Sequence, residues 1–227
     1  MIRFAFLESA GMRAAVMTDR SDGDCSDRPE NTANVDALLE RLPARPRRLL
    51  RMRQVHGACI VDADAINTAE QAPHEADGLI TRQPDTALGV SVADCAPVVL
   101  YDPVRRAAAA LHAGREGTRL NIAHAGVRAL AARFGCRAEH LLAVIGPCAG
   151  PCCYEVAPPM AQAWRDAGLP ARGRCLDIAD ANRIQLENAG VFRHNIRVVS
   201  HCTVCSGVFF SHRADNTWNR NLVLVMV

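Results

Sequence analysis

Short apolar runs, most of them with polar residues between, recur along the chain after residue 48. Their length and their content of Val, Ile and Leu predict strands. The predicted strands are 49–55, 58–62, 78–81, 87–92, 97–101, 107–112, 141–145, 195–199, 207–212 and 221–227.

Apolar positions at three- and four-residue spacing predict a second set of elements. The predicted helices are 35–42, 117–134, 157–167 and 177–189. Glycines directly after the last three favour helix ends there. Many strands, with helices gathered in the second half, are typical of an α+β or mixed α/β layered fold.

Residues 18–35, with the sequence TDRSDGDCSDRPENTANV, show neither the strand pattern nor the helix pattern of apolar positions. They are polar and turn-rich, so we interpret them as a surface loop leading into the first predicted helix. The length of 227 residues and the absence of repeats favour a single domain over 1–227.

Composition and charge narrow the class of protein. The chain is 49% hydrophobic and 22% charged with a net charge of +2, which is ordinary for a soluble protein. All 26 basic residues are arginine, and their one short cluster, at 45–53, reads as a solvated helix end and strand start. We therefore expect no nucleic-acid partner. No apolar run approaches the ~20 residues of a membrane span, so we expect no membrane association and a cytoplasmic location.

Ten cysteines are too few for a disulfide scaffold of this length, and we expect most to be free thiols in a reducing compartment. Two of them, Cys202 and Cys205, have the spacing of a zinc knuckle and follow His201. No second CxxC completes the set, and Cys148, Cys152 and Cys153 would have to come from a different loop. We therefore predict buried thiols there, with a structural zinc site as the alternative.

Three residues with metal-binding side chains stand at predicted strand ends. His56 precedes Gly57, Cys95 interrupts two apolar runs, and His112 ends an alanine-rich run. Imidazole and thiolate suit both zinc and copper. Three protein ligands leave a fourth position open, in which a metal lowers the pKa of water to about 7.

A metal-free alternative uses Cys95 as a thiolate nucleophile, with His112 as its base and Asp94 or another group orienting the imidazole. Asp94, the acid nearest to Cys95 in the sequence, is also a candidate for proton transfer. Asp77 is a candidate to orient a ligand histidine. The plainest alternative is that His56, Cys95 and His112 are packed core residues.

Seven short motifs, in order, resemble the laccase-domain or YfiH-like family, also called the multicopper polyphenol oxidase or peptidoglycan editing factor family. The resemblance runs from about residue 50 to the C-terminus, and the segment 1–48 diverges. The motifs are QVHG at 54–57, EADGLIT at 75–81, VADCAPVVLYDP at 92–103, HAG at 112–114, IGPCAGPCCYEV at 145–156, NRIQLENAGV at 182–191, and CTVC with FFSHR at 202–213.

The resemblance implies one α/β domain of layered mixed sheets flanked by helices, related to the deamidase domain of cytotoxic necrotizing factor toxins. It implies that His56, Cys95 and His112 form the metal and active site. Family members are described as zinc-dependent purine nucleoside phosphorylases with adenosine deaminase activity. Others are assigned as copper polyphenol oxidases or as hydrolases that edit peptidoglycan precursors. We expect zinc, or copper, with a purine nucleoside and phosphate as substrates of a monomer or homodimer.

The chain departs from the family at two places. The family motif His-Ala-Gly-Trp-Arg-Gly reads HAGREG here, with Arg115 and Glu116 in place of Trp and Arg. If the family arginine holds phosphate, Glu116 would repel it and Arg115 is the candidate replacement. In TWNRN, the residue before Arg220 is Asn219 where the family has Gly. A non-catalytic paralogue that only binds ligand is therefore a further alternative.

Two more residues are candidates for substrate binding. Tyr154 follows a Gly- and Pro-rich loop that the resemblance places near the cleft, and Arg213 is similar to a family arginine that could contact an anion.

Overall fold

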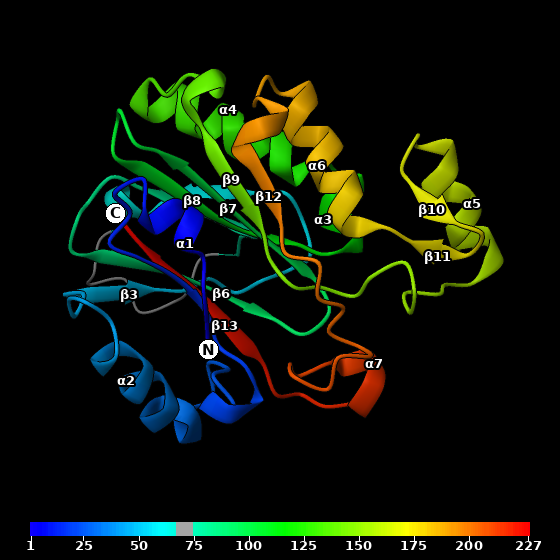
Figure 1. Ribbon diagram of the computed structural model, residues 1–227, viewed down its shortest axis with the longest axis horizontal. Helices are drawn as coiled ribbons and strands as arrows, with labels where there is room; N and C mark the ends of the chain where they lie inside the picture. Colours follow the sequence, from blue (N-terminus) through cyan, green and yellow to red (C-terminus); the bar gives the residue numbers. More distant parts are fainter. Residues whose placement is uncertain (67–74) are drawn as a thin grey trace.

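Two β-sheets lie face to face, with helices on their outer sides (Figure 1). The computed structural model describes residues 1–66 and 75–227. The five-stranded sheet has the order β1-β2-β13-β6-β3, and the six-stranded sheet has the order β12-β9-β7-β8-β5-β4. β10 and β11 pair separately. The strands are β1 (Ile2–Arg3), β2 (Ala14–Met17), β3 (Arg48–Leu50), β4 (Ile60–Asp62), β5 (Gly78–Thr81), β6 (Thr86–Val92), β7 (Ala96–Asp102), β8 (Ala107–Ala113), β9 (Leu142–Ile145), β10 (Ala171–Arg172), β11 (Cys175–Leu176), β12 (Ile196–Val198) and β13 (Asn221–Met226).

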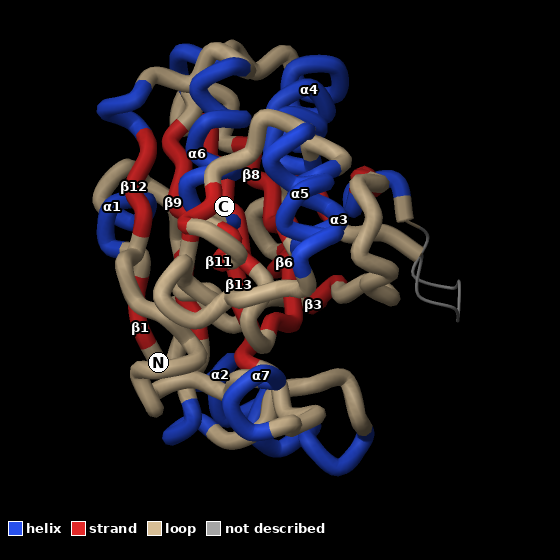
Figure 2. The backbone as a smooth tube through the Cα atoms, turned by 90° about the vertical axis from the view of Figure 1, so that its right-hand side faces the viewer, coloured by secondary structure: helices blue, strands red, loops and turns tan. Residues whose placement is uncertain are grey.

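Helices cover the outer face of each sheet (Figure 2), whereas α1 packs between the sheets. α4 and α6 pack on the six-stranded sheet, and α2 packs on the five-stranded sheet. Within the described residues, no helix is both long and apolar enough to cross a membrane. The helices are α1 (Ala5–Glu8), α2 (Thr32–Glu40), α3 (Arg115–Arg119), α4 (Ile122–Phe134), α5 (Pro158–Asp166), α6 (Ile178–Asn188) and α7 (His212–Asp215).

The central strands are buried on both faces. In β7, Val98 and Leu100 belong to the core beneath α4 and α6, whereas Val99 and Tyr101 belong to the core between the sheets. Because both faces are covered, such strands read as continuous apolar runs instead of alternating ones. The short side chains of β8 fill this position between a sheet and a helix layer.

The sheets mix parallel and antiparallel pairs, which confirms the predicted mixed α/β fold. β5 pairs antiparallel with β8 and parallel with β4, and β9 pairs antiparallel with β7 and parallel with β12. β2 lies between β1 and β13, so the first and last strands share one sheet. A single domain over 1–227 stays a prediction, and this pairing supports it.

Four local predictions were wrong. The predicted strand 49–55 ends at Leu50, and only an isolated bridge at Arg53 pairs beyond it. The run 207–212 is not a strand: Phe209 and Phe210 are buried from a loop, and the Ser211 hydroxyl accepts a hydrogen bond from Ala214 N that starts α7. The helix 117–134 is divided at Asn121, whose φ of 66° is left-handed. Residues 24–26 are buried, although we had interpreted 18–35 as surface loop.

Candidate functional site

His56, Cys95 and His112 meet at one end of the six-stranded sheet. Their potential ligand atoms all lie within 4.8 Å of one another. The two imidazole rings are 4.8 Å apart between centroids and meet edge to face. His112 is buried, Cys95 is half-buried and His56 is exposed, so the group is open to solvent on one side.

Strand pairing explains why Cys95 and His112 meet. β7 and β8 are antiparallel with Ala96 opposite Ala113, which places Cys95, just before β7, beside the end of β8. His56 and Asp94 have φ values of 61° and 86°, in the left-handed region that non-glycine residues rarely occupy. Such backbone persists only where surrounding contacts hold it, and it is frequent at functional sites.

Asp77 holds the backbone of His56 and the side chain of His112 in place. Its buried carboxylate accepts hydrogen bonds from the backbone N–H groups of His56 at 2.9 Å and Gly57 at 2.6 Å. It also lies 2.7 Å from His112 Nδ1. The second imidazole nitrogen, Nε2, is thereby left for Cys95 or a metal ion, as expected for an orienting carboxylate.

Cys95 and His112 shift each other's pKa. Burial would raise the pKa of the Cys95 thiol, but the His112 charge and hydrogen bonds from His112 and His56 lower it to about 6. Burial would lower the pKa of His112, but the Cys95 charge and the hydrogen bond to Asp77 raise it to about 9. Without metal, these shifts favour a thiolate and an imidazolium over a neutral pair.

Burial would also raise the pKa of Asp77, but its hydrogen bonds with His112 and with the Gly57 and His56 N–H groups hold that pKa below its usual value. Asp77 is consequently an anion that accepts hydrogen bonds over the whole range in which the pair is charged.

Gly114 leaves room for this arrangement. A Cβ atom at Gly114 would lie 3.0 Å from Cys95 Sγ and 3.2 Å from His56 Cδ2. Both distances are tighter than ordinary van der Waals contact, so a side chain there would displace two of the three residues.

The Asp94 carboxylate lies in a buried hydrogen-bond network. Its carboxylate accepts hydrogen bonds from Thr203 Oγ1 at 2.6 Å, Ser211 Oγ at 2.7 Å and Arg213 N at 2.7 Å. Its backbone carbonyl accepts a hydrogen bond from Ala149 N at 2.9 Å. Through its carboxylate and its carbonyl, Asp94 therefore joins the segment 203–213 to the loop around Ala149 beside Cys95.

A cavity of about 760 Å³ opens over the trio. This volume is within the range of about 300 to 1,000 Å³ that is usual for small-molecule sites. Five arginines and three acids line it, so its wall is cationic: Arg51, Arg53, Arg115, Arg213 and Arg220, with Asp27, Asp94 and Glu116.

The structure brings Arg115, Tyr154 and Arg213 to this cavity. The Arg213 guanidinium lies over the Tyr154 ring, 5.1 Å from its centroid, and Arg213 Nη1 donates to the Glu155 carbonyl at 2.7 Å. Glu116 also lines the cavity but is paired with Arg119 at 3.0 Å. That ion pair reduces the repulsion that Glu116 would exert on an anion.

Sequence reasoning missed several lining residues. Arg51 and Arg53 were interpreted as solvated surface, yet both line the cavity. Trp218 lines it as well, and 71% of its surface is exposed. The family motif lacks its tryptophan here, so a search for another aromatic near Arg220 could have found Trp218.

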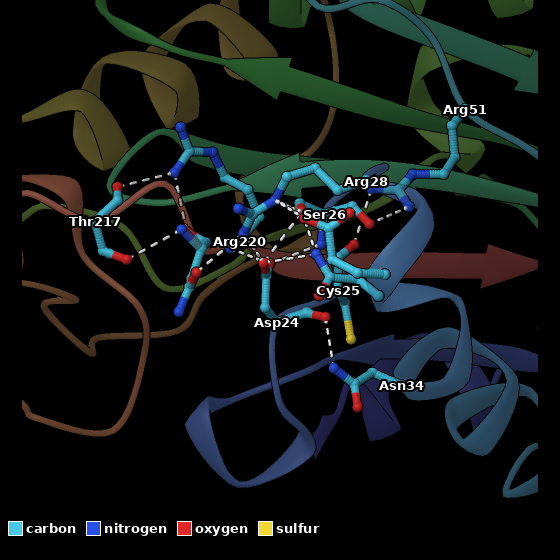
Figure 3. Close-up of polar contacts among 11 residues, drawn as sticks. Asp24, Cys25, Ser26, Arg28, Asn34, Arg51, Thr217 and Arg220 are labelled. Atoms are coloured by element: carbon cyan, nitrogen blue, oxygen red, sulfur yellow. Dashed lines mark hydrogen bonds and ion pairs between the residues drawn. The ribbon is translucent and has the colours of Figure 1, made fainter.

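The N-terminal segment helps to build this wall (Figure 3). Asp24 Oδ1 accepts hydrogen bonds from the N–H groups of Ser26 and Arg220, both at 2.9 Å. Arg51 Nη2 donates to the Cys25 carbonyl at 2.9 Å and to Ser91 Oγ at 2.6 Å. Segments near residues 25, 51 and 220 are thus tied together at one side of the cavity.

The remaining cysteines of the motifs do not all behave as predicted. Cys148 is buried in the core, as expected, but Cys152 and Cys205 are exposed. The prediction of buried thiols is therefore wrong for these two, because they lie on surface loops.

Comparison with protein families gives one match over most of the chain. Residues 17–227 match the family described as multi-copper polyphenol oxidoreductase laccase.

Named relatives are similar at about one third identity. A purine nucleoside phosphorylase of Streptomyces coelicolor is 37% identical over 199 residues, which are 83% of this chain and 79% of the relative. An adenosine deaminase from an unknown prokaryotic organism is 34% identical over 182 residues, covering 73% and 69%. The human purine nucleoside phosphorylase LACC1 is 36% identical over 154 residues, 63% of this chain but only 36% of the human protein.

Solved structures share the fold. The YlmD protein of Geobacillus stearothermophilus superposes with a TM-score of 0.81 and 30% identity over 94% of this chain and 91% of that one. The YfiH protein of Bacillus licheniformis gives a TM-score of 0.81 and 28% identity over 94% and 92%.

Proposed function

The chain belongs to the multi-copper polyphenol oxidoreductase laccase family, and on that basis we propose that it is a metal-dependent purine nucleoside phosphorylase. The reaction would convert a nucleoside and phosphate into a purine base and ribose 1-phosphate. One observation carries the proposal: a metal-binding trio and an arginine-lined wall share one cavity of nucleoside-compatible size.

The donor set fits one zinc ion, or one copper ion. Two imidazoles and a thiolate within 4.8 Å of one another match zinc ligands at about 2.0 to 2.3 Å from a common centre. His112 is oriented by Asp77 as a ligand histidine usually is. An ion bound there would supply Lewis-acid chemistry to the reacting oxygen.

We propose that Arg115 and Arg213 bind the phosphate. Arg213 is held before substrate arrives, because its N–H donates to Asp94 and its side chain to the Glu155 carbonyl. A preorganised guanidinium suits a phosphate because two of its N–H groups can donate in parallel. Arg115 begins α3 at the cavity edge, where its side chain contacts Met160.

The aromatic residues Tyr154 and Trp218 would hold the purine. Both line the cavity, and each has an arginine over its ring, Arg213 and Arg220 respectively. A flat apolar face beside a cationic anchor can stack the base while the phosphate lies against the arginines.

We assign Asp94 to positioning instead of proton transfer. Both of its oxygens already accept hydrogen bonds within the protein, so neither is free to exchange a proton with substrate. Asp94 would act by holding Arg213 and the backbone of Cys95 in place.

Adenosine deamination is the second activity that we propose for this site. It is supported by the relative named adenosine deaminase. The same cavity and ligand set would present a hydrolytic water to the purine instead of phosphate to the ribose.

The alternative of a cysteine hydrolase is favoured by one observation. Asp77, His112 and Cys95 form a connected acid, imidazole and thiol, as in cysteine hydrolases. Such an enzyme would survive chelation and be blocked by alkylation of Cys95.

The test is a chromatographic product assay of purified protein with inosine and adenosine, each with and without phosphate and with added zinc. We expect base release that depends on phosphate, and inosine from adenosine. Cys95→Ala should remove both products. Cys59→Ala is the matched control, because Cys59 is an exposed cysteine outside the cavity lining.

Three other outcomes would overturn the proposal. Turnover of a muramyl peptide that persists after chelation would favour the hydrolase. Oxidation of a phenol by the copper-loaded protein, and not by the zinc-loaded protein, would favour the oxidase. Absence of any product, with nucleoside still bound, would indicate a non-catalytic binding protein.

A further inference from the structure

Four cysteines from two loops gather at a second place on the surface. We propose that Cys152, Cys153, Cys202 and Cys205 bind a structural zinc ion. This proposal does not depend on the nucleoside reaction, because none of the four lines the cavity over His56, Cys95 and His112.

The separation of the sulfur atoms fits metal coordination. All four lie within 4.8 Å of one another, and the Sγ atoms of Cys152 and Cys205 are 3.9 Å apart. A tetrahedral zinc ion with zinc–sulfur distances of about 2.3 Å holds its sulfur atoms about 3.8 Å apart. A disulfide would require about 2.05 Å.

Backbone hydrogen bonds bring the two loops together just before the cluster. Cys148 and Cys202 form a parallel bridge, in which Cys148 N donates to the His201 carbonyl at 3.3 Å and Thr203 N donates to the Cys148 carbonyl at 3.0 Å. The first loop then turns at Gly150, whose carbonyl accepts from Cys153 N at 2.9 Å. The approach of the thiols is therefore built by the main chain.

A backbone donor already points at one of the sulfur atoms. Gly150 N donates to Cys202 Sγ at 3.3 Å. Such N–H groups favour the thiolate form, which is the form that binds zinc. A set of four thiolates leaves no open position, so the ion would be structural.

The location of the cluster shows what the ion would stabilise. The first loop contains Ala149, whose N–H donates to the Asp94 carbonyl, and leads to Tyr154 in the cavity. The second loop contains Thr203, whose hydroxyl donates to the Asp94 carboxylate. An ion joining the two loops would stabilise the segments that hold Asp94 and Tyr154 at the cavity.

The test counts zinc in protein that lacks the first site. We expect about two zinc ions per chain in the wild type and about one in the double variant His56→Ala, Cys95→Ala, measured by elemental analysis after gel filtration. Adding Cys205→Ser to that double variant should reduce the content to nearly none. Adding Cys59→Ser instead should leave it unchanged.

Cobalt provides a readout that does not depend on affinity alone. Cobalt bound to the double variant should show the intense thiolate charge-transfer and tetrahedral d–d bands of a four-thiolate site. Because Cys205→Ser could unfold the loop, Cys205→His is the second variant: it should retain about one ion and change the bands to those of three thiolates and one imidazole.

Three results would overturn the proposal. The first is a folded double variant, judged by circular dichroism, that holds no zinc or cobalt. The second is a zinc content that Cys205→Ser leaves unchanged. The third is a disulfide within the cluster, found by peptide mass spectrometry in protein purified with zinc.

Discussion

Two thiol-containing clusters lie in this molecule, and they are built in opposite ways. In the first cluster, Cys95 and His112 stand at strand ends and His56 lies in the loop between β3 and β4, and the buried carboxylate of Asp77 supports the trio. The four-cysteine cluster stands on two surface loops joined by one short β-bridge. The first opens onto a cavity, and the second does not line it.

The difference suits two separate roles, a reactive site at the trio and a structural site at the four cysteines. Three ligands, an orienting acid and an open side are features of a reactive metal site, whereas four thiolates suit a closed structural site. Loss of the trio should abolish the proposed reaction and keep the fold. Loss of the four-cysteine cluster should loosen its two loops and lower the reaction rate only slightly.

The largest expected effect is the contrast between Cys95→Ala and Cys205→Ser. Cys95→Ala should lower product formation by roughly a thousandfold or more, because it removes a ligand or nucleophile of the reacting unit. Cys205→Ser should lower it only a few-fold. Initial rates with inosine and phosphate measure both, and equal losses in the two variants would break the comparison.

Asp77→Asn should have the next largest effect, confined to the first cluster. Removing the charge that orients His112 should weaken zinc binding there by about 10- to 100-fold. Titration with a competing zinc chelator measures both ions, and the affinity of the four-cysteine cluster should stay the same. The control is Asp36→Asn, at a surface ion pair with Arg45. Equal weakening at both clusters would mean that Asp77 acts only on overall stability.

Arg115→Ala tests whether anion binding belongs to the first cluster. We expect the KM for phosphate to rise about tenfold, the equivalent of about 1.4 kcal/mol, with little change in kcat. Steady-state kinetics at varied phosphate provides the measurement, beside Arg128→Ala on the exposed face of α4. An unchanged KM would remove Arg115 from the phosphate site.

The smallest effect concerns thiol reactivity in chelator-treated protein. The pKa of Cys95 is lowered to about 6 by His112 and His56 against the opposing effect of burial. Burial raises the pKa of Cys152, with the neighbouring Cys202 thiol adding to the rise. Iodoacetamide at pH 7 should therefore modify Cys95 about fivefold faster, since a larger thiolate fraction outweighs its lower intrinsic nucleophilicity.

The same reagent gives the pH dependence. As pH falls through about 6, Cys95 becomes protonated and its alkylation rate should fall, whereas an ordinary thiol of pKa about 8.5 loses reactivity well above that pH. Peptide mass spectrometry of timed samples separates the two cysteines. Faster modification of the exposed Cys152 would show that access, not charge, controls reactivity.

Sequence patterns were informative where the chain is regular. The apolar runs predicted the central strands β5 to β9 to within a residue or so, because strands buried on both faces leave no other pattern. The interruption of those runs by His56, Cys95 and His112 predicted strand ends, which is correct for Cys95 and His112 and wrong for His56, a loop residue between β3 and β4. The structure nevertheless brings these three side chains together. Their roles as ligands stay a proposal.

What could not be predicted depends on contacts between distant segments. Cys152 and Cys205 are 53 residues apart and meet only because two loops pair at Cys148 and Cys202. The apolar run around Phe209 looked like a strand because burial, and not hydrogen bonding, determines its composition. Similarly, Trp218 reaches the cavity through the position of its loop, which carries no periodic pattern.

Gly114 has a consequence for the interpretation of genetic variants. A glycine codon is one base change away from codons for residues such as alanine, serine, aspartate and valine. Each of these would bring a Cβ atom to 3.0 Å from Cys95 Sγ and 3.2 Å from His56 Cδ2. A missense allele at this codon would thus crowd Cys95 and His56 while leaving the codons of all three trio residues unchanged, and a screen that reads only those codons would not detect it.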